Sequence, residues 1–237
     1  MTSETLVLIP PILCDARVFA PQMSAISAQH SVLFAVTRHG ERISEIASTI
    51  LDSAPSRFAL AGMGMGGMIA MELFRRAPGR ITRIALIATN PQADTPDVAA
   101  NREPLIIAAR AGRMNDVIAH ELAPAALAPT ANRPEVAALV QDMAHGLGPT
   151  AYVKQARAMQ RRPDQQDVLR KIKVPALIMC GDHDTQNTVR RHEFMADMIP
   201  YAKLEVLPDA AHLPTLERPN RSTAILQSWM AEPFVLR

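Results

Sequence analysis

Short apolar runs alternate with longer helical stretches along most of the chain, and this alternation limits the folds that the chain can adopt. The expected strands are rich in Ile, Leu, Val and Ala: Leu6–Ile9, Val32–Val36, Phe58–Ala61, Ile84–Ala88, Ala176–Met179 and Leu204–Leu207. Helices are expected between them at Ile43–Leu51, Met68–Arg76, Val189–Met198 and Ser222–Met230. Strands alternating with helices predict an α/β protein with a mostly parallel sheet. Continuous apolar runs predict strands that are buried on both faces.

One long interval interrupts this alternation. Residues 90–171 contain no convincing strand, but they contain helical patterns separated by proline and glycine: Pro104–Ala111, Asn115–Leu122, Pro134–His145 and Thr150–Gln160. Because the sites of open α/β sheets lie at the carboxyl ends of the strands, an inserted helical block is expected to cover such a site. The sequence therefore predicts a core of residues 1–90 and 172–237 and a helical lid of residues 91–171.

Charge and composition exclude several classes of protein. The chain has 25 Lys and Arg against 23 Asp and Glu, and this small excess predicts no nucleic-acid partner and no membrane surface. The two cysteines, Cys14 and Cys180, are too few for a disulfide framework. No apolar run approaches the roughly 20 residues of a membrane-spanning helix, and the start of the chain lacks the basic residues of a secretory signal. We expect a soluble, cytoplasmic protein.

A glycine-rich turn, Gly62-Met63-Gly64-Met65-Gly66-Gly67, follows the third expected strand and precedes a helix. It fits the dinucleotide-binding pattern G-x-G-x-x-G, and it also fits the nucleophile elbow G-x-S-x-G except at the central residue. A dinucleotide site requires an acidic residue at the end of the next strand, whereas Thr89-Asn90 stands there. The dinucleotide pattern also normally opens the fold. These features favour the elbow.

Two later segments support the elbow interpretation. The fifth expected strand leads into Gly181-Asp182-His183-Asp184, and the sixth leads into a loop that contains His212. The order elbow, acid, histidine is the one that the α/β-hydrolase arrangement requires. With the segments Leu8–Asp15 and Ala211–Pro219, the chain resembles the α/β-hydrolase family over essentially its whole length. The resemblance implies an α/β-hydrolase fold with a small helical lid.

The resemblance also implies a role for individual residues. Gly64 stands at the nucleophile position, His212 is the general base, and Asp184 orients the imidazole. The backbone N–H groups of Ile12 and Met65 form the oxyanion hole. The implied reaction is hydrolysis of an ester or related acyl bond in a small, fairly apolar molecule.

Contacts to that substrate are expected from one residue beside the elbow and from the lid: Met63, Tyr152, Gln155 and Arg161. No cofactor is implied. His183 has no second histidine or cysteine at ligand spacing, so no metal site is expected. The sequence leaves open whether the chain is a monomer or a homodimer.

The sequence departs from the family pattern at two positions. Gly64 has no side chain to attack a carbonyl, and neither Ser56 nor Cys14 is placed to replace it. Pro11 stands where relatives usually carry glycine, which removes one backbone N–H. Two explanations remain open: a serine was replaced in a working hydrolase, or the natural chain uses His212 and Asp184 without a nucleophile. The second includes cofactor-independent lyase or oxygenase chemistry, and ligand binding alone.

Overall fold

The computed structural model describes residues 4–122, 126–130 and 132–233. Its strands are β1 (Leu6–Ile9), β2 (Val32–Phe34), β3 (Phe58–Met63), β4 (Ile81–Ile87), β5 (Ala176–Gly181) and β6 (Ala202–Leu207). They form one sheet in the order β2-β1-β3-β4-β5-β6, and every neighbouring pair is parallel. The predicted α/β class with a mostly parallel sheet is confirmed, with strand ends that differ from the expected ones by up to three residues.

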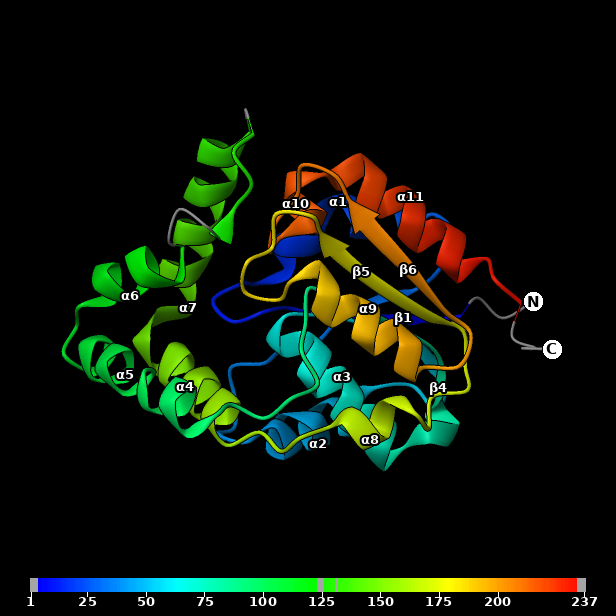
Figure 1. Cartoon of the computed structure of the whole chain (residues 1–237), viewed down its shortest axis with the longest axis horizontal. Helices are drawn as coiled ribbons and strands as arrows, with labels where there is room; N and C mark the ends of the chain where they lie inside the picture. The colour runs from blue at the N-terminus through cyan, green and yellow to red at the C-terminus, as the bar shows by residue number, and fades with distance from the viewer. Residues whose placement is uncertain (1–3, 123–125, 131, 234–237) are drawn as a thin grey trace.

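Helices cover both faces of the sheet (Figure 1). One face carries α1 (Ala20–Ile26), α10 (Pro214–Glu217) and α11 (Pro219–Met230), and the other carries α2 (Ile43–Ser53), α3 (Met65–Arg76), α8 (Gln166–Leu169) and α9 (Val189–Met198). Short 3₁₀ helices occupy Ala16–Phe19 and Pro78–Arg80. Alternate residues of β1 illustrate the result: Leu6 and Leu8 belong to one core cluster, and Val7 and Ile9 belong to the other. The four inner strands β1, β3, β4 and β5 are buried on both faces, as the continuous apolar runs predict. The same prediction is wrong for the edge strands β2 and β6, which have a neighbouring strand on one side only and are partly exposed.

The segment between β4 and β5 forms a separate helical layer beside the sheet (Figure 1). It contains α4 (Pro96–Ala100), α5 (Glu103–Arg110), α6 (Met114–Glu121) and α7 (Arg133–Gln160), which we call the cap helices. They enclose a small apolar core of their own. The helical path of α7 is broken at Gly148, whose φ is 75°, directly before Pro149. The expected helices on either side of this break are therefore present.

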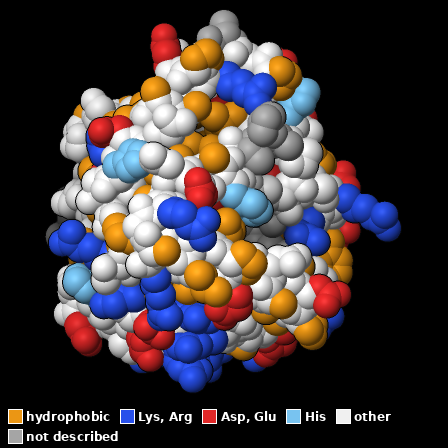
Figure 2. Space-filling model, turned by 90° about the vertical axis from the view of Figure 1, so that its left-hand side faces the viewer, with side chains coloured by type: hydrophobic (Ala, Val, Ile, Leu, Met, Phe, Trp, Pro, Cys, Tyr) orange, Lys and Arg blue, Asp and Glu red, His pale blue; other side chains and the backbone are white. Residues whose placement is uncertain are grey.

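The expected lid segment extends further along the chain than this layer. Val168 and Leu169 of α8 are buried in the core cluster that contains α3 and β4, so α8 is part of the layer that covers the sheet. Figure 2 views the molecule from the side of the cap helices, where basic, acidic and hydrophobic side chains are interspersed. None of the described helices is long and apolar enough to cross a bilayer.

Candidate active site

The chain turns sharply at Gly64, between the last residue of β3 and the first residue of α3. Its backbone angles are φ 55° and ψ −119°, a conformation that costs a residue with a side chain on the order of 1–3 kcal/mol. Glycine adopts it freely. The backbone is also tightly packed here, because a Cβ atom on Gly66 would lie 2.1 Å from the carbonyl oxygen of Ile9. This geometry positions residue 64 at the carboxyl edge of the sheet, facing the loops that follow the other strands.

Asp184 and His212, which follow β5 and β6, meet at this edge. His212 Nδ1 lies 3.0 Å from Asp184 Oδ2. The other carboxylate oxygen of Asp184 accepts hydrogen bonds from the backbone N–H groups of Gln186 and Asn187, each at 2.9 Å. His212 Nε2 lies 3.5 Å from the position that a Cβ atom would take on Gly64. The structure therefore brings together the three positions that the sequence singles out.

The buried Asp184–His212 pair stabilises its charged form. Burial alone would lower the pKa of His212, but attraction to Asp184 and the hydrogen bond between them outweigh it, so the pKa lies above the ordinary value. Burial alone would raise the pKa of Asp184, and the same interaction with His212 lowers it instead. The carboxylate therefore holds the imidazole with Nδ1 protonated and Nε2 directed to the substrate side.

Glu217, which the sequence did not single out, fixes the loop that carries His212. Glu217 is 2% exposed, and its carboxylate accepts hydrogen bonds from the N–H groups of Ala128, Ala211 and Leu213. Two of these donors flank His212 directly. The segment around Glu217 is part of the resemblance to the family, but its sequence does not show that this acid turns inward.

A second histidine, also missed, supports the turn at Gly64. Thr89 donates from Oγ1 to the carbonyl oxygen of Gly64 at 2.6 Å and from its N–H to His192 Nε2 at 3.1 Å. His192 Nδ1 lies 3.0 Å from the carbonyl oxygen of Thr188, so this nitrogen carries the proton. Burial lowers the pKa of His192. A neutral His192 therefore holds Thr89 against the turn.

The loop after β1 contributes the other expected oxyanion donor, Ile12. The next residue, Leu13, has a φ of 64°, and its N–H donates to Gln155 Oε1 at 3.2 Å. Gln155 in turn donates to Thr37 Oγ1 at 3.1 Å. Met65 is the first residue of α3, where backbone N–H groups have no partner within the helix. Ile12, Gly64 and Met65 all line one cavity.

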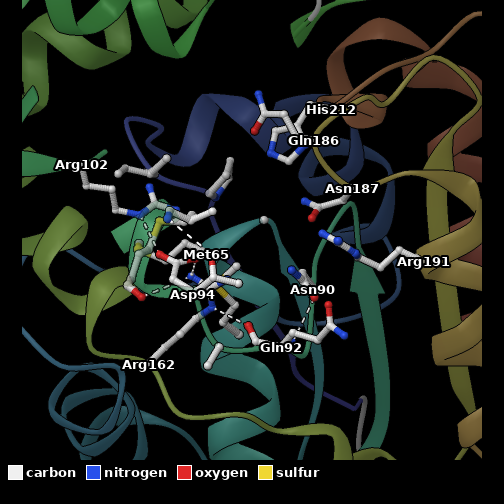
Figure 3. A pocket seen from close by; sticks show the side chains of 18 of the residues that line it. Met65, Asn90, Gln92, Asp94, Arg102, Arg162, Gln186, Asn187, Arg191 and His212 are labelled. Atoms are coloured by element: carbon white, nitrogen blue, oxygen red, sulfur yellow. Dashed lines mark hydrogen bonds and ion pairs between the residues drawn. The ribbon is translucent and has the colours of Figure 1, made fainter. Parts of the chain in front are cut away.

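That cavity has a volume of about 300 Å³ (Figure 3). Apolar side chains line it near the turn, and further away its walls are polar: Asn90, Gln92, Asp94, Arg102, Glu121, Arg162, Gln186, Asn187 and Arg191. A side cavity of about 40 Å³ adjoins it at Pro11, Ile12 and His212, with Cys14 and Val140 among its walls. The main cavity is more polar than the sequence interpretation expected.

The four residues expected to contact substrate lie elsewhere, and none lines either cavity. Met63 is fully buried in the sheet core, where its sulfur faces Thr215 Oγ1. Tyr152 is buried among the cap helices and donates to Glu121 Oε1 at 3.0 Å. Gln155 is fully buried in its bonds to Leu13 and Thr37. Arg161 is half-exposed and pairs with Glu41 at 3.0 Å. Each of these side chains is already engaged in a structural contact.

Pro11 occupies the space in front of Gly64. A Cβ atom on Gly64 would lie 2.9 Å from the Pro11 Cβ atom, closer than Cβ atoms approach other atoms in proteins. The pyrrolidine ring is rigid and cannot rotate away. Any side chain at position 64 therefore requires the loop after β1 to shift.

Within residues 4–122, 126–130 and 132–233, no group of three or more His, Cys, Asp and Glu side chains is arranged to hold a metal ion.

Comparison with known proteins adds evidence from outside the chain. Residues 12–224 match the model of the alpha/beta hydrolase family. The chain is 22% identical over 187 residues to a pimeloyl-[acyl-carrier protein] methyl ester esterase of Nitrosomonas europaea, a match that covers 76% of this chain and 74% of the relative. The enol-lactonase from Burkholderia xenovorans LB400 has a similar structure, with a TM-score of 0.87, 27% identity and coverage of 98% and 93% of the two chains. A malate-bound thermophilic esterase from Thermogutta terrifontis also has a TM-score of 0.87, with 23% identity and coverage of 97% and 90%.

Proposed function

Because the chain belongs to the alpha/beta hydrolase family, we propose that its main cavity binds an ester or related acyl compound, with the carbonyl carbon next to Gly64. One observation carries this proposal: His212 Nε2 lies 3.5 Å from the Cβ position of residue 64 and is held there by Asp184. A general base at that place faces the atom that would attack a carbonyl group. The N–H groups of Met65 and Ile12 are the proposed donors to the developing oxyanion.

The chemistry of this proposal depends on what attacks the carbonyl. With serine at position 64, His212 would accept the hydroxyl proton and later return it to the leaving alcohol, after an acyl-enzyme had formed. Gly64 cannot form that ester. In the present chain His212 acts on a water molecule instead, and Asp184 stabilises the imidazolium that results. Direct attack by water forgoes the covalent step, so we expect slow turnover. No cofactor enters this scheme.

The relatives and the side cavity together support an ester substrate whose alcohol part is small. The Nitrosomonas europaea relative is named as a methyl ester esterase. The side cavity of about 40 Å³, beside His212 and lined by Leu13, Cys14 and Val140, has room for a group of a few heavy atoms. We propose that the substrate is an ester of a short alcohol whose alkyl group enters this side cavity. The acid part would then occupy the main cavity.

A second candidate function follows from Pro11. A Cβ atom at position 64 would lie 2.9 Å from the Pro11 Cβ atom, which is too close, so the two departures from the family pattern fit each other. This fit favours a natural chain over a hydrolase from which a serine was removed. In such a chain His212 removes a proton from water or from a carbon atom next to a carbonyl, which includes lyase-type reactions. A chain of this kind that only binds a ligand, with no catalysis, is the other possibility within this second candidate.

The test is hydrolysis of p-nitrophenyl acetate and butyrate by the present chain and by Gly64→Ser, Pro11→Gly and the double variant. We expect a burst of acyl-enzyme only in the double variant, because Pro11 obstructs serine in the single one. Combining the double variant with His212→Ala should abolish turnover. An inactive but folded double variant would contradict the hydrolase proposal and leave proton removal from carbon, or ligand binding alone, as the function. Equal bursts from Gly64→Ser and the double variant would contradict the proposed fit of Pro11 and Gly64.

A further inference from the structure

We propose that the ligand of the main cavity carries a carboxylate group and that Arg191 and Asn90 bind it. This inference rests on the proposed function, because it describes the acid part of the same acyl compound. It follows from the charges and hydrogen-bond donors that the cavity leaves unused.

Arg191 is the one arginine of the cavity that lacks an acidic partner within the part of the chain that the structure describes. Asp94 pairs with the other two: its Oδ2 lies 2.9 Å from Arg102 Nε, and its Oδ1 lies 2.6 Å from Arg162 Nη1. Both oxygens of Asp94 are therefore engaged. Arg191 is partly buried, and its guanidinium group extends into the cavity between Asn187 and Asn90 (Figure 3). An unpaired, partly buried guanidinium favours a bound anion.

The position of Arg191 in its helix is a second reason why a bound anion would be stabilising. Arg190 and Arg191 lie in the first turn of α9, and that turn contains no acidic residue. The N-terminal end of a helix is already partially positive, so arginine is unfavourable there unless a negative charge is nearby. An anion in the cavity supplies that charge. His192, the next residue, adds none because burial holds its pKa low.

Asn90 contributes a donor whose direction is fixed. Its side chain is 8% exposed, and its Oδ1 accepts the N–H of Gln92 at 3.0 Å. This bond turns Nδ2 to the opposite side, toward the space that Arg191 enters (Figure 3). Among the described residues, Nδ2 of Asn90 has no hydrogen-bond acceptor. Asn90 lies on the cavity wall, so a ligand oxygen in the cavity can accept a hydrogen bond from this amide.

The available donors match a carboxylate. A planar guanidinium pairs with both oxygens of a carboxylate in parallel bonds, and Asn90 adds one further donor. A phosphate dianion carries more charge and more acceptor oxygens than this set satisfies. Two acidic residues line the wall: Asp94, which is paired with two arginines, and Glu121. Glu121 would repel an anion near it and so favours the Arg191 end. The ligand is therefore a compound with an acyl carbon at Gly64 and a carboxylate at Arg191.

The test measures binding, so that it does not depend on turnover. Monomethyl and dimethyl esters of succinic, glutaric and adipic acid are titrated into the chain by calorimetry, with inorganic phosphate as a separate probe. The three acids sample different spacings between the two ends of the ligand. We expect at least one monomethyl ester to bind tenfold or more tightly than its dimethyl ester. Phosphate should bind more weakly than that monoester.

Two matched variants locate the effect. Arg191→Gln should abolish the preference for the monoester, and Arg190→Gln, which removes the same charge one residue away and outside the cavity, should retain it. Arg191→Lys keeps the charge but loses the planar pair of donors, so an intermediate preference is expected. Unfolding temperatures of the variants establish that each is folded.

Equal binding of monoesters and diesters, equal behaviour of the Arg191→Gln and Arg190→Gln variants, or tighter binding of phosphate would overturn the inference. The proposed function has a separate readout, namely cleavage of neutral p-nitrophenyl esters by the Pro11→Gly/Gly64→Ser variant. A charge preference without such cleavage would leave the carboxylate site standing and remove the hydrolase proposal. Cleavage without a charge preference would do the reverse.

Discussion

Pro11 and Gly64 show how a contact between two residues decides which chemistry the turn can support. The sequence contains both departures from the family pattern, but it does not show that they touch. In the structure, the Pro11 Cβ atom lies 2.9 Å from the position where a side chain on residue 64 would begin. The turn also holds residue 64 at a positive φ. Serine at this position is therefore disfavoured by the backbone conformation and by its neighbour.

Gly64→Ser should destabilise the chain, and Pro11→Gly should relieve part of that loss. The positive φ alone costs about 1–3 kcal/mol, and contacting residues typically show coupling energies of about 0.5–3 kcal/mol. Urea unfolding of the present chain, both single variants and the double variant measures the coupling. Gly79→Ser serves as a control, because a Cβ atom on Gly79 meets no atom within 4 Å. Additive effects of the two substitutions would show that the ring does not obstruct position 64.

Asp184→Asn should lower the pKa of His212. In the present chain, Asp184 raises that pKa against the effect of burial, so removing the carboxylate leaves burial dominant. NMR titration of the imidazole resonance that disappears in His212→Gln measures the shift. The pair also makes the stability of the fold depend on pH, with one limit set by each partner. The raised pKa of His212 stabilises the fold below an ordinary value of about 6.5, and this stabilisation is lost as the pH rises through the folded pKa.

The acid partner sets the lower limit. The lowered pKa of Asp184 stabilises the fold above an ordinary value of about 3.9, and this stabilisation is lost as the pH falls through the folded pKa. Asp184→Asn should therefore remove the pH dependence that Asp184 contributes in the acid range. At His212 it should reverse the dependence, because a histidine whose pKa is lowered by burial destabilises the fold as the pH falls. An unchanged pKa of His212 in this variant would contradict the assigned hydrogen bond.

At the scale of single elements, the loop after β6 depends on a residue from the helix that follows it. Glu217, the last residue of α10, accepts hydrogen bonds from the N–H groups on both sides of His212 and from Ala128. The base is therefore held in place by the backbone around it as well as by Asp184.

Glu217→Ala should lower the free energy of unfolding by at least about 1–3 kcal/mol, the cost of leaving a buried hydrogen-bonding group without its partner. The cause is the set of buried N–H groups left without an acceptor. Thermal and urea unfolding test this, with exposed Glu193→Ala as the matched control. We expect Glu217→Gln to lie between the two, because the amide keeps one acceptor oxygen. A loss in Glu217→Ala no larger than that of the control would show that the carboxylate does not hold the loop.

Across the whole molecule, the sequence predicted the features that local patterns encode and missed those that depend on contacts between distant segments. Apolar runs and glycine-rich turns specify strands and their ends, so the order of the elements followed from local sequence. The grouping of Gly64, Asp184 and His212 followed from that order together with the resemblance to the family. Wall residues of the cavity depend on helix rotation instead. Arg161 and Arg162 are neighbours that point about 100° apart around a helix end: the first pairs with Glu41 outside, and the second with Asp94 inside. Nothing in the sequence around them indicates which one turns inward.

The same limit applies to the cap helices. Gln155 lies in a segment that the sequence correctly predicts as helical, but its amide is used to fix Leu13 and Thr37 and does not reach the cavity. The sequence correctly indicates that the Gln155 amide can both donate and accept hydrogen bonds. Their partners come from segments more than a hundred residues away, and no local pattern specifies them.

Cys14, in the wall of the side cavity, can report when that cavity opens. Burial raises the pKa of the Cys14 thiol strongly and that of Cys180 to about 12, and both cysteines are unpaired. Alkylation by iodoacetamide therefore proceeds through open states. Cys14 becomes accessible when the cavity beside His212 opens, whereas Cys180 lies inside β5 and requires disruption of the sheet. The ratio of the Cys14 labelling rate to the Cys180 labelling rate, measured by mass spectrometry, should exceed one. It should fall when a ligand occupies the cavity, so the ratio reports ligand entry without an added fluorophore.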